Sequence, residues 1–227
     1  MSTPLLWVII PGIMAFILFF LRRWKKVAVI SGTLFSLLLS FLAWKLPIGD
    51  FLQIGGWILE ILDTFSILGR KLILEATDRP LLVFIYLVAA FWFAGSYAAS
   101  ESTLFVPLGM GMISILTAAL SVAPFLYAAL LIEMAVLVSI PIFGSTGEIA
   151  RPAILRYLIF QTMGMPFILF SGWFLAGLEA SPGDSDLVVR AAIVTAIGFS
   201  FLLAIFPFHS WIPMLADKAK PYSTAFV

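Results

Sequence analysis

The sequence predicts an all-α polytopic membrane protein with about seven transmembrane helices and its N-terminus outside. Hydrophobic residues make up 63% of the chain and charged residues 11%, whereas a soluble domain carries about 25% charged residues. The apolar residues form long runs, and about 20 residues rising about 1.5 Å each cross a hydrocarbon core of about 30 Å. Basic residues follow the first run instead of preceding it. A soluble globular domain is therefore excluded.

Seven apolar runs are expected to form the spans. They cover residues 4–21, 27–46, 81–98, 104–122, 124–143, 152–177 and 188–206. The first is followed by Arg22-Arg23-Trp24-Lys25-Lys26, whereas a signal peptide has its positive charge before the apolar run. We expect an uncleaved span with this basic segment in the cytoplasm; the alternative role of the segment is to bind anionic lipid. This orientation places eight basic residues inside and five outside, as the positive-inside rule favours.

The longest segment that is not apolar, residues 47–80, is expected to form an external cap. Gly55-Gly56-Trp57 is typical of a turn, and the weak alternation from Gly69 to Glu75 favours a short strand or hairpin around residues 55–75. Acidic and basic residues are mixed along this segment. Such a mixture indicates a solvated surface rather than a binding site.

Cysteine is absent and histidine occurs once. Without cysteine the chain has no thiolate metal site, haem-attachment motif, iron–sulfur ligand or disulfide, and one histidine does not build a histidine-based metal centre. The net charge is +1, so no basic surface indicates nucleic-acid binding. We expect no cofactor or metal in this chain and no nucleic-acid partner, and we expect contact with the lipid bilayer.

Glu133 is the strongest candidate for chemistry, because it lies near the middle of the run 124–143. A charge at that depth costs about 2.5–3.5 kcal/mol on insertion scales. Its neighbours on the same helical face are Ala129, Leu130, Val136 and Leu137. None has a hydrogen-bonding side chain, so any partner must come from another span or from water. A carboxyl held between burial, which favours the neutral acid, and a cation, which favours the charge, suits a proton relay; the alternative is a protonated structural glutamate.

The segment Pro207-Phe208-His209-Ser210-Trp211-Ile212-Pro213 follows the seventh run. Two prolines six residues apart do not both fit inside a regular helix without freeing backbone groups. Freed carbonyls at membrane depth occur only where they are buried or line a wet cavity. The segment therefore predicts either a seventh helix broken near Pro207, with a titratable His209 suited to proton transfer, or a helix that leaves the membrane with His209 and Trp211 at the interface.

Arg156 begins the sixth span. A long cationic side chain at the end of a span reaches the membrane interface while its stem stays in an apolar environment. The alternative is that Arg156 is the outermost member of a polar path that continues through Gln161 and Thr162. Spacing alone does not separate the two.

Four stretches of the sequence, taken in order along the chain, carry a resemblance to a known family. They are Gly55-Gly56-Trp57 with Leu72-Ile73-Leu74-Glu75, then Glu133, then Arg156-Tyr157 with Phe160-Gln161, then Pro207 to Pro213 with Pro221. Together they resemble the antiporter-like membrane subunits of respiratory complex I, a family that includes subunits of multi-subunit sodium/proton antiporters and membrane-bound hydrogenases. The last stretch is the most specific, and the resemblance covers most of the chain.

The resemblance implies a mechanism. In that family a glutamate on the fifth span pairs with a lysine on a broken seventh span, and protons pass along a central polar axis, driven by redox chemistry in other subunits. Glu133 matches the glutamate. The lysine is expected seven residues before His209, where this chain has Leu202, and neither Phe201 nor Leu203 supplies a cation.

The resemblance also implies a domain organisation. The family has about fourteen spans, including two inverted five-helix repeats. We therefore expect an N-terminal three-helix region with its external cap at residues 1–103, and an incomplete first repeat, spans four to seven without span eight, at residues 104–227. The apolar end at Phe226-Val227 predicts a truncated or split gene product, and the alternative is a complete seven-span protein.

From these features we expect a proton-translocating membrane subunit, or its N-terminal part, of a complex-I-like pump of the NADH:quinone oxidoreductase type. Glu133 is expected to relay protons, with lesser roles for Arg156 and His209, while other membrane subunits are the partners and supply the redox chemistry. The alternatives are a sodium/proton antiporter subunit and a non-conducting scaffold, which Leu202 favours. The expected location is a prokaryotic plasma membrane or an organellar energy-transducing membrane.

Overall fold

The computed structural model describes residues 2–46, 48, 51–54, 57–60, 63–67, 69–143, 150–180 and 185–227, without side chains at 51–54, 57–60, 67 and 178–180. The chain is a polytopic helical membrane protein, as predicted. Among the described residues, five helices are long and apolar enough to cross a membrane, and two shorter apolar helices cover Leu5–Leu21 and Phe105–Ser121. The five are α2 (Lys25–Lys45), α3 (Arg79–Ala98), α5 (Leu126–Phe143), α6 (Arg151–Ala180) and α7 (Ser185–Leu202). Each of the seven overlaps one of the predicted spans.

By its packing the chain divides into two compact units, Met1–Ser121 and Val122–Val227. Unit 1 contains the first four apolar helices and the hairpins of the cap, and unit 2 contains the last three and two short C-terminal helices. This division follows the packing of the helices and does not test the repeat boundary at residue 104, which stays a prediction.

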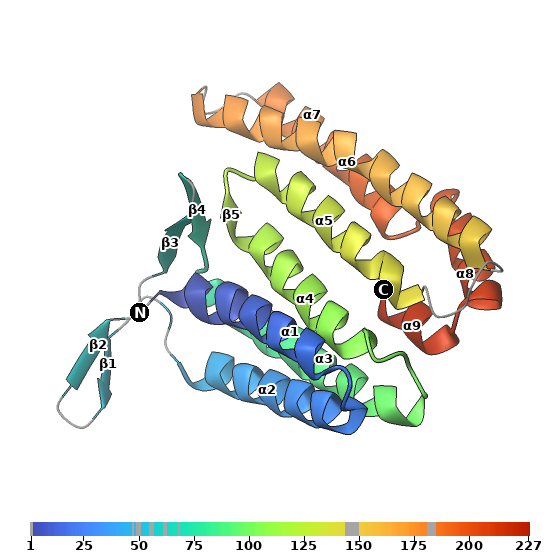
Figure 1. Ribbon diagram of the computed structural model, residues 1–227. Coiled ribbons are helices and arrows are strands. Elements are labelled where there is room, and N and C mark those ends of the chain that lie inside the picture. Colours follow the sequence, from blue (N-terminus) through green and yellow to red (C-terminus); the bar gives the residue numbers. More distant parts are fainter. Residues whose placement is uncertain are drawn as a thin grey trace. The chain divides into compact units, whose positions relative to one another are not determined.

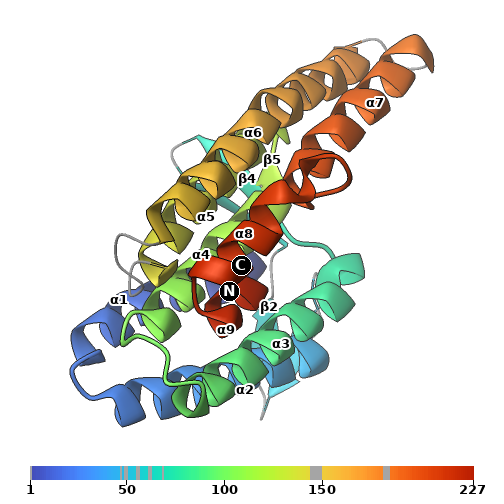
Figure 2. The ribbon, with the colours of Figure 1, turned by 90° about the vertical axis from the view of Figure 1, so that its right-hand side faces the viewer.

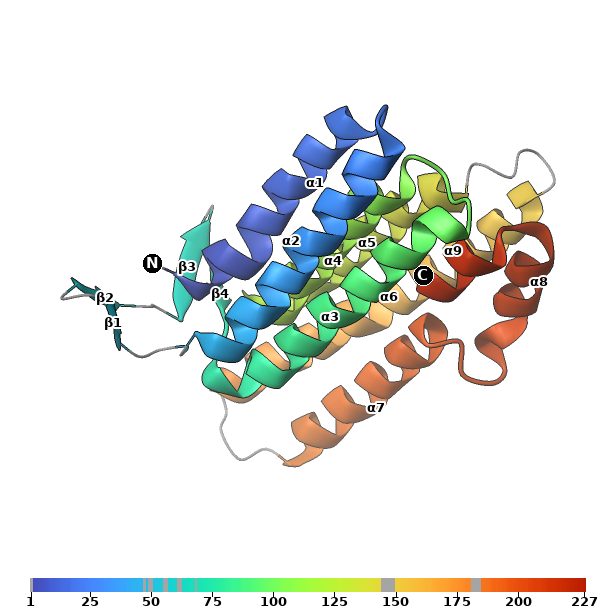
Figure 3. The same cartoon turned by 90° about the horizontal axis from the view of Figure 1, so that it is seen from below.

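In unit 1, α2 packs along α3, and α1 (Ile10–Leu21) packs along α4 (Phe105–Ser121). Figure 3 shows α2 and α3 side by side. A π-helical turn, Leu5–Ile9, precedes α1 and places Trp7 in the interior, fully buried. The buried Tyr86 hydroxyl donates a hydrogen bond to the Trp7 carbonyl, so α3 is held to the start of the chain.

The cap contains two antiparallel hairpins, which Figure 1 shows as separate pairs of arrows. The first pairs β1 (Phe51–Ile54) with β2 (Trp57–Glu60), and the second pairs β3 (Thr64–Ile67) with β4 (Arg70–Ile73). A 3-10 turn, Ala76–Asp78, then leads into α3. The predicted strand or hairpin is thus confirmed, while Gly55 and Gly56, the predicted turn, lie outside the described residues.

In unit 2, the short strand β5 (Val122–Ala123) leads into α5, and α5 and α7 each pack on α6. Figure 2 shows α6 and α7 side by side. Two short helices follow, α8 (Trp211–Lys218) and α9 (Pro221–Phe226), and α8 packs on α6 as well. The 30-residue helix α6 is therefore the element on which the other helices of unit 2 are assembled.

Glycines allow the helices of unit 2 to approach α6 closely. A Cβ at Gly172 of α6 would lie 2.5 Å from the Leu126 Cα of α5, and a Cβ at Gly198 of α7 would lie 3.2 Å from the Gly164 carbonyl oxygen of α6. Both positions are buried. Because any larger side chain would push these backbones apart, the glycines set the distances between the helices that hold the site described below.

The seventh helix breaks before Pro207, as predicted, but α7 ends at Leu202 rather than near Phe206, so the predicted end of that span was wrong. The Ile205 amide bonds to the Ser200 carbonyl, and the Ala204 amide to the Phe201 carbonyl. Ala204 has φ 51°. This is the Schellman ending of a helix, whose left-handed residue is normally glycine. An alanine at this position gives the sequence no visible stop signal.

Candidate functional site

Glu133 lies in the middle of α5 and its carboxyl meets α6. The Thr162 hydroxyl donates a hydrogen bond of 2.9 Å to Glu133 Oε1. The other oxygen, Oε2, is buried and has no hydrogen-bond partner among the described residues. The partner of Oε1 comes from another helix, as the sequence predicts, and it is a neutral hydroxyl rather than a cation. One oxygen of the carboxyl is therefore hydrogen-bonded, and the other is a buried polar atom without a described partner, which is costly to leave unsatisfied.

A second polar pair lies further along the same helix contact. Ser139 follows Glu133 by six residues on α5, and Tyr157 precedes Thr162 by five residues on α6. Because α5 and α6 pack antiparallel, Ser139 and Tyr157 lie opposite each other in the helix contact. The Ser139 and Tyr157 hydroxyl oxygens are 2.9 Å apart, and Ser139 also donates to the Val136 carbonyl at 2.6 Å. Tyr157 therefore donates to Ser139. Six residues of helix span about 9 Å, so the two pairs lie about this far apart along α5.

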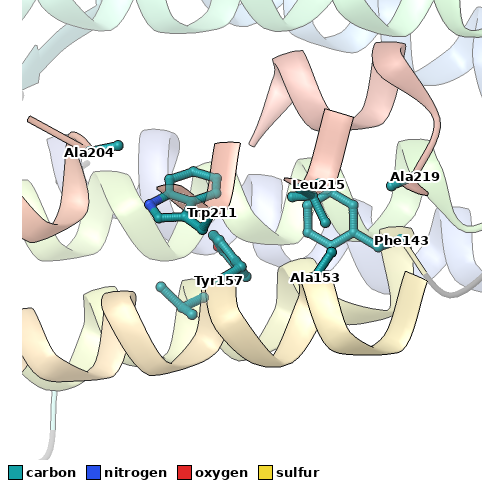
Figure 4. Close-up of a cluster of buried hydrophobic side chains, with 8 residues drawn as sticks. Phe143, Ala153, Tyr157, Ala204, Trp211, Leu215 and Ala219 are labelled. Atoms are coloured by element: carbon teal, nitrogen blue, oxygen red, sulfur yellow. The ribbon is translucent and has the colours of Figure 1, made fainter. Parts of the chain in front are cut away.

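An apolar cluster closes one side of this second pair (Figure 4). The Tyr157 ring packs edge-on against Phe143 at a centroid distance of 5.6 Å and against Trp211 at 5.0 Å. Figure 4 shows Trp211 and Tyr157 pointing toward one another, with Leu215 beside Phe143. The Trp211 Nε1 group is buried without a partner among the described residues. Tyr157 is thus covered by Phe143 of α5 and Trp211 of α8.

Gln161, one residue before Thr162, holds the end of α7. Its side-chain Nε2 donates a hydrogen bond of 3.3 Å to the Leu202 carbonyl. The last carbonyls of a helix have no partner within the helix, so Gln161 supplies one from α6. The Leu202 side chain packs beside a buried apolar cluster of Ala129, Met165 and Ile168. Where the resemblance implies a lysine, the structure therefore has an apolar contact and a capped helix end.

Pro166 interrupts α6 directly at the site. A proline inside a helix has no amide to bond the carbonyl four residues earlier, and here that carbonyl belongs to Thr162. The backbone of α6 is therefore one hydrogen bond short at the residue that holds Glu133. Within a membrane such freed carbonyls occur where they are buried in protein or line a wet cavity.

Arg156 and His209 lie at the surface of unit 2. Arg156 is exposed on α6, and no ion pair joins it to a described carboxylate. His209 is exposed in a 3-10 turn, Phe208–Ser210, where its ring stacks on Phe206 at a centroid distance of 5.8 Å. Neither hydrogen-bonds with Glu133 in the described part of the chain. The structure brings Glu133 together with Thr162, while the roles expected for Arg156 and His209 stay predictions.

The proline segment continues into α8. Pro213 is the third residue of α8, within the first helical turn, where a missing amide leaves no hydrogen bond unmade. The segment after the break packs on α6, the same helix on which α7 packs. The helix is therefore broken, while the position of His209 and Trp211, within the membrane or at its interface, stays a prediction.

The site contains one carboxyl and several hydroxyls. The described residues contain no group of three or more His, Cys, Asp or Glu side chains that could bind a metal ion. Hydroxyls both donate and accept hydrogen bonds, and a carboxyl accepts or releases a proton. The Glu133–Thr162 and Ser139–Tyr157 pairs are separate hydrogen-bonded pairs in the contact between α5 and α6.

Ser139 and Pro166 belong to this site and were not singled out in the sequence, and Tyr157 was named there only as part of the stretch Arg156-Tyr157. Ser139 follows Glu133 by six positions, and residues six apart do not share a face of a helix. Helical periodicity therefore did not predict that Ser139 and Glu133 belong to one site. A signal for Pro166 was present in the sequence, because Pro166 follows the polar residue Thr162 by four positions in an apolar run. A proline at that spacing leaves the Thr162 carbonyl without its helical hydrogen bond. Ser139 and Tyr157 required knowledge of how α5 and α6 pack.

Comparison with known proteins gives a partial match. NADH-quinone oxidoreductase subunit N 2 of Acidobacterium capsulatum is 32% identical to this chain over an alignment 96 residues long; the match covers 37% of this chain and 19% of that protein. The match thus spans about a fifth of the length of this curated relative. No family model matches the chain, and no solved structure matches it.

Proposed function

We propose that this chain is a membrane subunit, or part of one, of a redox-driven proton pump of the NADH:quinone oxidoreductase type, and that Glu133 relays protons within it. The observation that carries this proposal is the carboxyl of Glu133 in the middle of an apolar helix, bonded at Oε1 by Thr162 of the next helix. An ionisable group at such a depth marks a functional site by default. The partial similarity to a subunit of NADH-quinone oxidoreductase supports the same class of assembly.

In this proposal the proton is taken up and released at Oε2 of Glu133. Thr162 occupies Oε1, whereas Oε2 has no partner among the described residues. A hydroxyl tolerates both forms of the carboxyl, because it needs only an acceptor and Oε1 keeps its lone pairs in either form. Thr162 therefore holds the carboxyl in place without fixing its charge. The group that exchanges protons with Oε2 is water or a base from other spans or subunits.

Other membrane subunits are the proposed partners, because the similar protein is named as a subunit of NADH-quinone oxidoreductase and the protein part of a redox-driven pump relies on cofactors for electron transfer. The bacterial origin of the similar protein supports a prokaryotic plasma membrane as the location. Arg156 and His209 are proposed as exposed outer members of the path. Their exposed side chains support this part of the proposal.

A second candidate is a scaffold that keeps this fold without conducting protons. The observation that favours it is Leu202, which packs in an apolar cluster instead of supplying a cation near the break of α7. A carboxyl whose described hydrogen-bond partner is a neutral hydroxyl also fits a structural role.

Replacement of Glu133 by glutamine separates the two functions. Glu133→Gln keeps the size of the side chain and the acceptor for Thr162 but removes the exchangeable proton. In vesicles carrying the assembled complex, we expect NADH-driven proton uptake per electron to fall sharply, with normal amounts of complex. The matched control is Glu101→Gln, because Glu101 is also buried, at 3% exposure, and lies in unit 1. Unchanged pumping in Glu133→Gln, together with dispersal of the complex when the chain is deleted, would establish the scaffold.

A further inference from the structure

A groove lies between α2 and α3 of unit 1, at the end where α2 begins. Its volume is about 450 Å³, and it is lined by Lys26, Val29, Ile30, Thr33, Leu34, Ala94 and Tyr97. The walls are almost entirely apolar, and the Lys26 ammonium group stands at one end. Pockets of about 300–1,000 Å³ hold small molecules or parts of larger ones. Ala94 is exposed, so this small residue leaves room in the groove instead of packing against α2.

The positive charge at this end of unit 1 is concentrated beside the groove. Lys25 Nζ lies 5.7 Å from the centroid of the Tyr97 ring, which is itself part of the lining. Lys26 has no ion pair with a described carboxylate. The side chain of Trp24 does not cap α2, so the free amides and the positive end of the helix dipole also face this region. Glu101, the one acid near this end of α3, offsets a single charge of the four in the segment Arg22 to Lys26.

We propose that this groove binds an anionic diacyl phospholipid. The phosphate lies between Lys25 and Lys26 at the start of α2, and an acyl chain lies along Val29, Ile30, Leu34 and Ala94. The positive-inside rule accounts for the basic residues alone, but it does not account for an apolar groove that leads directly away from them. A phospholipid has this same order of parts, an anionic head followed by an apolar chain. The proposal does not depend on the proposed proton relay.

Two other grooves lack this combination of features. One, of about 270 Å³, lies at the opposite end of α2 and α3 beside Arg79, but the Arg79 guanidinium already donates to the carbonyls of Ala43 and Trp44, at 3.3 and 2.5 Å. The other, of about 500 Å³, lies between α6 and α7 and has Arg190 as its one basic residue. The groove beside Lys26 is the one, among these three, whose cations are both clustered and free of backbone acceptors.

The test measures lipid bound to the purified full chain by native mass spectrometry. Phosphatidylglycerol and phosphatidylcholine with identical acyl chains are added separately to the protein in detergent. We expect one tightly retained phosphatidylglycerol per chain and weaker retention of phosphatidylcholine. Lys26→Gln is expected to weaken phosphatidylglycerol binding about fivefold, the effect of one basic residue at a membrane surface, and to leave phosphatidylcholine unchanged.

Two further variants locate the lipid. Ala94→Phe fills the groove from an exposed position and is expected to remove the retained phosphatidylglycerol. Lys218→Gln removes an exposed lysine of α8 in unit 2 and is expected to leave binding unchanged. Equal retention of the two lipids by the unmodified chain, equal losses in Lys26→Gln and Lys218→Gln, or full binding in Ala94→Phe would each overturn the proposal. Circular dichroism of every variant checks that the helices are intact.

Discussion

The two units of this chain use their buried polar side chains differently. In unit 1, five described side chains bond to backbone carbonyls of another segment: Trp7 to Leu39, Ser40 to Val83, Arg79 to Ala43 and Trp44, Tyr86 to Trp7, and Ser114 to Val8. In unit 2, three described bonds between helices join two side chains: Glu133 with Thr162, Ser139 with Tyr157, and Ser171 with Thr195. One further bond in unit 2, from Gln161 to the Leu202 carbonyl, ends on the backbone.

The difference is one of chemistry as well as of packing. A backbone carbonyl is a fixed acceptor, so a hydroxyl bonded to it joins two segments and goes no further. A hydroxyl bonded to another hydroxyl or to a carboxyl can exchange the roles of donor and acceptor. The bonds of unit 1 to backbone carbonyls therefore hold helices in place, while unit 2 contains the Glu133–Thr162 pair on which the proposed proton relay rests.

The largest expected effect breaks the close contact between α5 and α6. A Cβ at Gly172 would lie 2.5 and 2.6 Å from the Leu126 Cα and backbone nitrogen, and a backbone cannot rotate away as a side chain can. Gly172→Ala is therefore expected to lower the free energy of unfolding by about 3 kcal/mol, as overpacking does. The thermal midpoint of the protein in detergent is the measurement.

Gly111 of unit 1 is the matched control for Gly172. A Cβ at this position would lie 3.6 Å from the Ala15 Cβ, an ordinary contact. Because alanine is the better helix former, Gly111→Ala is expected to raise the stability by about 0.5–1 kcal/mol. A similar loss of stability in Gly172→Ala and Gly111→Ala would contradict this prediction, because only Gly172 lies where a Cβ would meet the backbone of another helix.

A smaller effect is expected at the end of α7. Gln161→Met keeps the length of the side chain but leaves the Leu202 carbonyl without its donor from α6. An unsatisfied buried polar group costs about 1–3 kcal/mol, so we expect a loss of about 2 kcal/mol and faster hydrogen exchange at the amides of Leu203 to Ile205. If exchange there is unchanged, Gln161 does not hold the broken helix in place.

The smallest effects on stability are expected when a single hydroxyl is removed. They compare a hydroxyl bonded to a backbone carbonyl in unit 1 with a hydroxyl bonded to a carboxyl in unit 2. Ser114→Ala in unit 1 removes a 2.7 Å bond to the Val8 carbonyl and is expected to cost about 1 kcal/mol without changing proton uptake. Thr162→Val in unit 2 is expected to change stability no more than this, but to lower proton uptake per electron because Glu133 loses its partner. Thr162→Ser, which keeps the hydroxyl, should restore uptake. Equal proton uptake in Thr162→Val and Ser114→Ala would remove the functional distinction between the units.

The spans were predictable because the signal for them is local. Runs of apolar residues, the basic segment Arg22 to Lys26 and the mixed charges of the cap each require only neighbouring residues, and all seven predicted spans are helices. The end of α7 was not predictable in the same way. Ala204 takes the left-handed conformation that glycine usually adopts, and Gln161, 41 positions earlier, satisfies the carbonyl of Leu202.

The sequence by itself determined that this is a membrane protein of apolar helices and that Glu133 lies within one of them, because burial in lipid depends on composition and depth. It also required that the partner of Glu133 come from elsewhere, since the neighbours on its own helical face are apolar. Only the tertiary structure decided that this partner is Thr162 and that Ser139 bonds Tyr157. Those pairs depend on the antiparallel alignment of α5 with α6, which Gly172 and the other close contacts set, and no local pattern encodes the level at which two helices meet.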